Sequence, residues 1–179
     1  VELAAIADGT VVTASAEMRA MARSVAADAA RGQTLVELKA VDNVYPLYGA
    51  MALSPEMPLD EALATQGGVP GLVVEPNLLT RLGVDIGEQV RIGDTDFELR
   101  ATIIREPDRV ADGFALGPRA MISRAALAGT GLVQPGSLVE YHYRVRLPAA
   151  ARTSEDISTW VASLNERFPD AGWRVRDRS

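Results

Sequence analysis

The amino-acid sequence predicts an α+β fold in which a split-βαβ (ferredoxin-like) unit, made from the two ends of the chain, carries an inserted small β-rich subdomain. Residues 137–147 alternate strictly between apolar and polar side chains, as in a half-buried strand, and an amphipathic helix follows them. Between residues 68 and 108, short apolar runs separated by turn residues indicate a small barrel-like module. We therefore assign residues 1–42 and 136–179 to the first unit and residues 43–135 to the insertion.

The N-terminal segments carry mixed signals. Val1–Ala7 is short and apolar, and we expect it to end a helix. Thr10–Ser24 alternates imperfectly, and its Ala, Met, Glu and Arg residues also favour a helix, so both states remain open. After these segments we expect a loop over Ala26–Gly32, strands over Gln33–Val41 and Val44–Leu53, and a helix over Ser54–Gln66. Pro46 places the second of these strands at a sheet edge or bulge, since proline cannot donate a ladder hydrogen bond.

The segment from Gly68 to Asp108 gives the clearest local signals. The run Leu72–Val74 indicates a buried strand, and Pro76 opens a short helix that Gly83 ends in the left-handed conformation. Gly93 and Asp94 form a hairpin turn between two expected strands, Gln89–Ile92 and Phe97–Ile104.

The C-terminal part is expected to begin with a loop over Glu106–Pro118. It continues with a strand over Arg119–Ser123, a helix over Arg124–Ala128 that Ser123 caps, the strand Ser137–Leu147, a helix that Thr153 or Ser154 caps, and a final strand over Gly172–Arg178. The last helix repeats apolar side chains at helical spacing, which predicts a buried stripe that includes Trp160 and Phe168.

Composition excludes several classes of protein. The net charge of −6 argues against a nucleic-acid partner, because phosphate binding needs a basic face. Without cysteine the chain forms no disulfide. It contains no signal peptide and no apolar run of roughly 18 residues. Since it begins at Val1 without Met, we expect a piece of a longer protein. Lys39 is the only lysine beside 17 arginines, which we interpret as codon bias.

Catalytic, metal and cofactor signals are weak. His142 is the only histidine, it lies in an expected strand, and no Gly-x-Ser-x-Gly motif accompanies it, so a solvated strand face is the preferred interpretation. Asp94 and Asp96 lie together in a hairpin turn, but no third ligand follows at loop spacing. No phosphate-binding loop is present. We predict no catalytic residue, no metal site and no cofactor.

Six residues are candidates for contact with a partner or substrate. Phe114 and Leu116 are apolar residues in the otherwise polar loop 106–119, where they either form a contact site or pin the loop by burial. Asp108 and Arg109 form a recognition pair or a local salt bridge. Tyr45 and Tyr48 suit a contact surface, although packing in an edge strand explains them equally well.

One family shares these patterns. The run VVEPNLLTRLGVDIGEQVRIGDTDFELRATI resembles the extracytoplasmic domain of MacB/FtsX-like ABC permeases, where a similar run builds a subdomain inserted into a porter-like subdomain. Four further segments are similar to the YbbP-type branch, which is associated with a lysophospholipase/thioesterase partner; they are Glu17–Arg23, Leu35–Asp42, Tyr45–Gly49 and Trp173–Ser179. The resemblance implies that Thr10–Ser24 is a strand and that residues 43–135 form a sabre-like subdomain. The family's first strand is missing here, which leaves one sheet edge open or filled by another chain.

The resemblance implies a non-catalytic periplasmic domain of a bacterial inner-membrane permease. It would couple ATP-driven motion, supplied by a cytoplasmic ABC ATPase subunit, to the handling of a hydrophobic or lipid-like substrate, or it would dock a periplasmic lysophospholipase/thioesterase. Two alternatives remain: a soluble small-molecule- or partner-binding domain of an unrelated multidomain protein, and a hydrolase that uses His142. Membrane spans on either side of the chain would distinguish the permease from the soluble domain.

Overall fold

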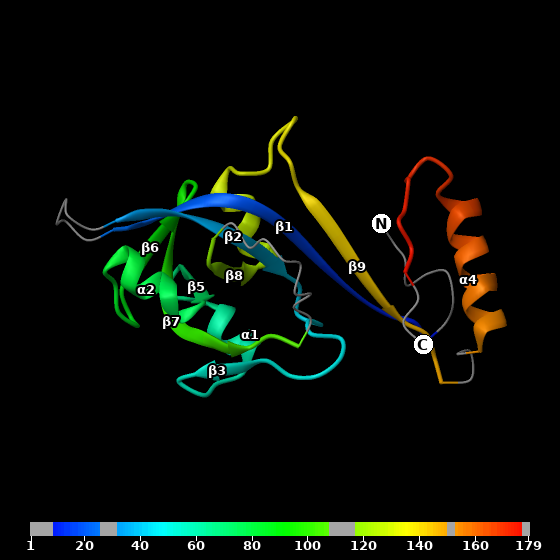
Figure 1. Ribbon diagram of the computed structural model, residues 1–179, viewed down its shortest axis with the longest axis horizontal. Helices are drawn as coiled ribbons and strands as arrows, with labels where there is room; N and C mark the ends of the chain where they lie inside the picture. Colours follow the sequence, from blue (N-terminus) through cyan, green and yellow to red (C-terminus); the bar gives the residue numbers. More distant parts are fainter. Residues whose placement is uncertain (1–8, 26–31, 108–116, 150–152, 177–179) are drawn as a thin grey trace. The chain divides into compact units, whose positions relative to one another are not determined.

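The computed structural model describes residues 9–25, 32–107, 117–149 and 153–176. The chain divides into two compact units, one of residues 13–143 and one that combines residues 1–12 with residues 144–179 (Figure 1). The mixed sheet with few helices confirms the α+β class. The split-βαβ arrangement of the chain ends and the predicted boundaries at residues 42/43 and 135/136 stay predictions.

The helices and strands follow one another in chain order. They are β1 (Val11–Ser24), β2 (Gln33–Val41), β3 (Ala52–Ser54), α1 (Leu59–Leu63), β4 (Thr65–Gln66), β5 (Val69–Val74), α2 (Pro76–Leu82), β6 (Gln89–Ile92), β7 (Thr95–Arg105), β8 (Arg119–Ser123), α3 (Arg124–Leu127), the 3₁₀ turn η2 (Ala128–Thr130), β9 (Glu140–Arg146) and α4 (Ser154–Arg167).

Six strands of the larger unit form a closed ring. The pairs run β7–β6, β6–β1, β1–β2, β2–β8, β8–β5 and β5–β7, so the last pair returns to the first strand. The β2–β8 and β5–β7 pairs are parallel, and the other four are antiparallel. Closure leaves no unpaired edge within the ring. The sequence predicts a barrel-like module within residues 68–108, but that segment supplies only β5, β6 and β7, and β1, β2 and β8 complete the ring. Outside the ring, β3 pairs with β7, β4 with β5, and β9 with β1 (Figure 1).

Strands β1 and β2 show how alternation builds the interior of the barrel. They pair without a break from Ser15↔Val41 to Arg23↔Gln33. Ala16, Ala20 and Ala22 of β1 are buried, whereas Arg19 and Arg23 on the other face are exposed. The Thr10–Ser24 segment is therefore the strand that the resemblance implies. The interior cluster consists of Ala16, Ala20, Ala22, Val36, Leu38, Ala40, Leu72, Val74, Leu78, Leu82, Val84, Val90, Ile92, Phe97, Leu99, Ala120, Ile122 and Leu127.

A second apolar cluster is separate from the barrel interior. It gathers Val41, Tyr45, Leu53, Ala62, Leu63, Val73, Ala101, Ile103 and Met121. Strand β7 contributes to both clusters because its pairing with β5 shifts register: Leu72 faces Leu99, but Val73 faces Ala101. The extra residue, Arg100, is buried, and its guanidinium donates to the carbonyl oxygens of Glu61, Ala64 and Val69, which lie in and after α1. The bulge thus ties the short helix α1 to the barrel.

Helix α2 matches its prediction. Pro76 is its first residue, and Leu78 and Leu82 are buried on one face. Gly83 ends the helix in the left-handed region, with φ 63° and ψ 45°, where a residue without Cβ is favoured. The predicted hairpin of β6 and β7 is confirmed, as is the Ser123 cap of α3, whose hydroxyl accepts from the amide of Ala126.

Two predictions for residues 44–66 are wrong. Val44–Leu53 is not one strand; only Ala52–Ser54 pairs, because Pro46 lacks an amide donor and Gly49 turns the backbone at φ 74°. The predicted helix over Ser54–Gln66 is limited to α1. Thr65–Gln66 instead pairs with Val69–Pro70 across a turn made by Gly67 and Gly68. Those two glycines bring the chain back on itself before the helix can continue.

The smaller unit contains α4. Thr153 caps α4 with a complete capping box, in which its hydroxyl accepts from the Asp156 amide and the Asp156 carboxylate accepts from the Thr153 amide. Leu164 is the buried residue of this helix, whereas Trp160 and Phe168 are only half-buried, so the prediction of a fully buried stripe is wrong. Phe168 makes an edge-to-face contact with Trp173, with ring centroids 6.4 Å apart.

The predicted strands near the C-terminus differ from the structure in length. Strand β9 is shorter than the predicted Ser137–Leu147. The described part of the predicted last strand, residues 172–176, is not assigned to a strand. The predictions for Val1–Ala7 and for most of the loops Ala26–Gly32 and Glu106–Pro118 lie outside the described residues.

Candidate functional site

Charged side chains are buried together where β1, β2 and β8 meet the end of β7. Lys39 is 3% exposed, and its ammonium lies 2.7 Å from Glu106 Oε1, 3.1 Å from the Tyr45 hydroxyl and 3.5 Å from Glu17 Oε1. The Tyr45 hydroxyl also lies 3.1 Å from Glu106 Oε1, and the ammonium lies 4.5 Å from the centre of the Tyr45 ring. The Lys39 ammonium therefore donates to Glu106 and Tyr45 and forms an ion pair with Glu17.

Arg119 completes this cluster. Its guanidinium donates to Glu17 Oε2 at 3.0 Å, and its Nε lies 3.6 Å from Glu106 Oε2. Neither of the last two atoms has a hydrogen-bond partner, so they are held by charge rather than by a direct bond. We call Glu17, Lys39, Tyr45, Glu106 and Arg119 the Lys39 network. It contains two cations and two carboxylates, and its charges balance.

The network shifts the titration of two of its members. Burial raises the pKa of Glu17, but Lys39 and Arg119 outweigh that effect and leave the pKa of the Glu17 carboxyl below its ordinary value. For Arg119, burial lowers the pKa, and Glu106 and Glu17 more than compensate, so the pKa of the guanidinium is raised. Both groups stay charged at neutral pH. The Lys39 and Glu106 side chains are 4% and 1% exposed, so this ion pair is closed to solutes, whereas the Glu17 side chain is 28% exposed.

Asp42 organises the turn that follows β2. Its carboxylate accepts from the Thr13 hydroxyl at 2.7 Å and from the Ala14 amide at 2.6 Å, which links the turn to β1. It also accepts from the amides of Val44 and Tyr45, at 3.1 and 3.2 Å. A single carboxylate thus orders the chain that leads to Tyr45.

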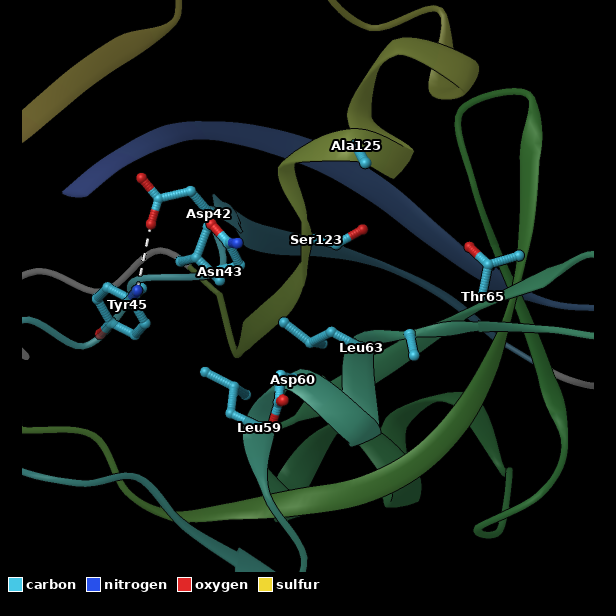
Figure 2. Close-up of a pocket in the computed structure, with 11 residues that line it drawn as sticks. Asp42, Asn43, Tyr45, Leu59, Asp60, Leu63, Thr65, Ser123 and Ala125 are labelled. Atoms are coloured by element: carbon cyan, nitrogen blue, oxygen red, sulfur yellow. Dashed lines mark hydrogen bonds between the residues drawn. The ribbon is translucent and has the colours of Figure 1, made fainter. Parts of the chain in front are cut away.

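A small pocket lies beside this turn. It has a volume of about 240 Å³ and is lined by Val41, Asp42, Asn43, Tyr45, Leu59, Asp60, Leu63, Ala64, Thr65, Ser123 and Ala125. Figure 2 shows Leu59 and Leu63 of α1 on one side and Asn43 and Ser123 on the other, with the Asp42 carboxylate turned toward the Tyr45 amide. The pocket can hold a small group that is apolar on one side and hydrogen-bonds on the other. Its volume lies below the roughly 300–1,000 Å³ of drug-sized ligand sites.

The predicted contact residues have separate positions. Tyr45 is 7% exposed and belongs to the Lys39 network, whereas Tyr48 is 55% exposed. Asp108, Arg109, Phe114 and Leu116 lie outside the described residues. The contact role of all six residues stays a prediction.

The residues considered for catalysis and metal binding have local partners. His142 is half-exposed on β9, and its Nε2 lies 3.7 Å from a Glu140 carboxylate oxygen. Arg91 pairs with both carboxylate oxygens of Asp96, at 2.5 and 2.6 Å. Among the described residues, no group of three or more His, Cys, Asp or Glu side chains could hold a metal ion.

Sequence reasoning missed the Lys39 network. The sequence analysis interprets the single lysine as codon bias, but in the structure the Lys39 side chain is buried in an ionic network. The presence of a single lysine beside 17 arginines is the sequence signal that could have pointed to this network. Glu106 and Arg119 could not be joined to Lys39 in advance, because they lie 67 and 80 positions away along the chain.

Sequence comparison relates part of the chain to a permease. No protein-family model matches. Over 110 residues the chain is 34% identical to the uncharacterised ABC transporter permease YbbP of Escherichia coli strain K12. The match covers 62% of this chain and 13% of YbbP, so the chain spans about an eighth of that relative.

Three solved structures share the fold. They are the extracellular domain of the ABC-type transporter YknZ from Gram-positive bacteria (TM-score 0.59, 14% identity, 93% of this chain and 80% of that one), the periplasmic region of MacB from Actinobacillus actinomycetemcomitans (0.54, 12%, 88% and 67%), and a domain of a permease protein from Porphyromonas gingivalis (0.54, 12%, 94% and 76%).

None of the helices in the described ranges is long and apolar enough to cross a membrane. The neighbours YknZ and MacB were solved as extracellular and periplasmic regions. The chain is thus similar in sequence to part of an ABC transporter permease, and it shares its fold with the extracellular domain of YknZ and the periplasmic region of MacB.

Proposed function

We propose that this domain is non-catalytic and couples ATP-driven motion to events outside the membrane. A cytoplasmic ABC ATPase subunit acts on the full-length permease, whose membrane helices move the domain. The domain in turn handles a hydrophobic or lipid-like substrate. Docking of a periplasmic lysophospholipase or thioesterase is a second role that the same movement can serve.

The observation that carries this proposal is the 34% identity with a permease over 110 residues. The fold adds a physical argument. A closed ring of strands around one apolar cluster, with a second cluster and a buried ionic network beside it, resists deformation. Such a unit moves as a rigid body when the membrane helices displace it.

The contact surface of this proposal consists of the residues that the sequence singles out. Tyr48 is 55% exposed. Phe114 and Leu116 are the proposed apolar contacts, and Asp108 and Arg109 the proposed polar ones. Aromatic and arginine side chains often dominate binding energy at protein interfaces. Tyr45 supports this surface from within through its bonds to Lys39 and Glu106.

The experiment uses the full-length permease together with its ATPase in liposomes that contain a fluorescent lysophospholipid. We expect ATP-dependent release of the lipid to an acceptor protein and stimulation of ATP hydrolysis by the lipid. The variant Tyr48→Ser combined with Phe114→Ser should lose the stimulation and keep the basal rate. The matched control Glu56→Ser alters an exposed residue that is not a proposed contact and should behave like the wild type.

Two results would contradict the substrate role: lipid release that does not depend on ATP, or equal stimulation in the wild type and the contact variant. A pull-down with the periplasmic lysophospholipase/thioesterase tests docking separately. Binding that survives the contact variant would exclude this surface as the docking site.

A further inference from the structure

We propose that the pocket between α1 and the turn after β2 binds a basic side chain, lysine or arginine, presented by a partner polypeptide. The methylene stem of that side chain lies on the apolar floor of the pocket, and its cation meets the Asp60 carboxylate at the rim. This inference goes beyond the proposed function and does not rest on it, since Tyr45 is the one proposed contact residue that also lines the pocket.

The floor of the pocket is apolar. Val41, Tyr45 and Leu63 are 2%, 7% and 4% exposed. Leu59, one turn before Leu63 on α1, lies on the same side of the pocket (Figure 2). A floor of this kind offers contact to hydrocarbon, and long basic side chains bury their methylene stems on such surfaces while the charged end stays in water.

Three polar groups of the lining already have partners within the fold. The Asp42 carboxylate accepts four hydrogen bonds, which hold the turn after β2. The Ser123 hydroxyl accepts from the Ala126 amide at the start of α3. The Tyr45 hydroxyl lies within the Lys39 network. These groups require nothing from a ligand, so the polar groups that remain for one lie at the rim.

The rim carries an unneutralised charge. Asn43, Asp60 and Thr65 are exposed there. Within the described part of the chain the Asp60 carboxylate has no hydrogen-bond or ion-pair partner. Two of the lining residues are aspartates and none is Lys, Arg or His, and the exposed Arg124 is not part of the lining. The charge of the pocket therefore complements a cation at the rim.

The size of the pocket indicates a single side chain. At about 30 Å³ for each water molecule, its volume of about 240 Å³ has room for about eight waters. A lysine or arginine side chain, with roughly five to seven non-hydrogen atoms, fits this space. An ethanolamine lipid headgroup fits it less well, because its stem is short and the phosphate that follows is repelled by Asp42 and Asp60. A polypeptide is therefore the source that we propose.

NMR titration of this chain with two probes tests the site. The probes are N-acetyl-lysine amide and N-acetyl-norleucine amide, which has the same hydrocarbon stem without the ammonium group. We expect saturable shifts at the amides of Asn43, Ala64 and Thr65, and binding of the lysine probe about fivefold tighter at low salt, as suits an exposed ion pair. Sodium chloride at about 0.5 M should reduce this preference.

Three variants locate the effect. Asp60→Asn should remove most of the preference for the lysine probe. The matched control Glu61→Gln, the next carboxyl along α1, is exposed and outside the lining, so it should keep the preference. Ala125→Leu adds volume at an exposed position of the lining and should abolish the shifts with both probes. Each change lies at an exposed residue, where substitutions usually alter stability little.

Four results would overturn the proposal. They are equal affinity of the wild type for the two probes, shifts that do not saturate, shifts that persist in Ala125→Leu, and a preference for lysine that persists in Asp60→Asn. Bicelles of phosphatidylethanolamine that shift the same amides when the lysine probe does not would assign the pocket to a lipid headgroup and also overturn it. None of these outcomes affects the lipid-release experiment on the full-length permease, so the two proposals fail separately.

Discussion

Lys39 Nζ lies 2.7 Å from Glu106 Oε1, although the two residues are 67 positions apart and both side chains are almost completely buried. The contact joins the middle of β2 to the residue that follows β7. Ion pairs at this depth are costly to break from one side, because the partner left behind is a buried, uncompensated charge. The first two predictions follow from this network.

Lys39→Met should lower the free energy of unfolding by about 3–5 kcal/mol, because Glu106 loses its closest cation. Combining it with Glu106→Leu should restore most of the loss, since the two charges disappear together. Urea denaturation followed by circular dichroism measures both. Arg105→Met serves as the control and should change stability by about 0.5 kcal/mol or less. A double variant as unstable as the single one would show that the pair itself stabilises the fold.

The stability of the chain should fall in acid partly through Glu17. Its pKa is lower in the folded chain than in the unfolded one, so its contribution is fully present above the unfolded value of about 4.5 and is lost as the pH falls through the folded value. Glu17→Gln should therefore be less stable than the wild type at pH 7, and the gap should narrow below about pH 4.5. Urea midpoints at pH 7, 5, 4 and 3 test this prediction. A gap of constant size would contradict it.

Asp42→Ala should destabilise the chain by about 2–4 kcal/mol, because four donors lose the carboxylate that they share. Asp42→Asn should cost less, since its amide oxygen still accepts hydrogen bonds. Thermal unfolding with Asp60→Asn as the control measures the effect, as Asp60 is an exposed carboxyl that lines the same pocket. Equal losses at the two positions would disprove the role of Asp42 in the turn.

Gly71 and Gly67 are glycines for two different reasons. At Gly71 another backbone segment lies too close for a Cβ, and at Gly67 the backbone has a positive φ. A Cβ at Gly71 would overlap the carbonyl oxygen of Ala62 in α1, and the Arg100 guanidinium is also close. A Cβ at Gly67 would meet nothing within 4 Å, although its φ of +58° disfavours other residues. Gly71→Ala should therefore cost about 3 kcal/mol and Gly67→Ala about 1 kcal/mol. Chemical denaturation ranks the two variants, and the reverse order would contradict the observed packing of α1 on β5.

Elements with local signals were predicted with nearly correct bounds. Helix α2 is an example, since Pro76, the spacing of Leu78 and Leu82, and Gly83 together specify its start, face and end within eight residues. The same holds for the Ser123 cap of α3 and for the cap of α4, where the structure selects Thr153 from the two predicted candidates, Thr153 and Ser154. In each case the interacting groups lie within one or two helical turns, so the pattern that predicts them is contiguous.

Local signals failed where distant segments compete. Val44–Leu53 carries strand-forming side chains, but most of it follows the turn ordered by Asp42 and packs Tyr45 into the second cluster. Trp160 and Phe168 lie at core spacing, yet both remain half-buried. The spacing of hydrophobic residues predicts which face of a helix is apolar, but the packing of other elements against that face determines how much of it is buried.

The sequence by itself determined the α+β class, the short helices with their caps, the strands β5, β6 and β7 of the middle segment and the resemblance to permease domains. Only the tertiary structure closed the ring through the parallel β2–β8 and β5–β7 pairs and brought Lys39, Glu106 and Arg119 together. The physical reason is the distance along the sequence between the interacting residues. Caps and turns depend on neighbouring residues, whereas parallel pairing and a buried ionic network join residues tens of positions apart, whose meeting no local pattern encodes.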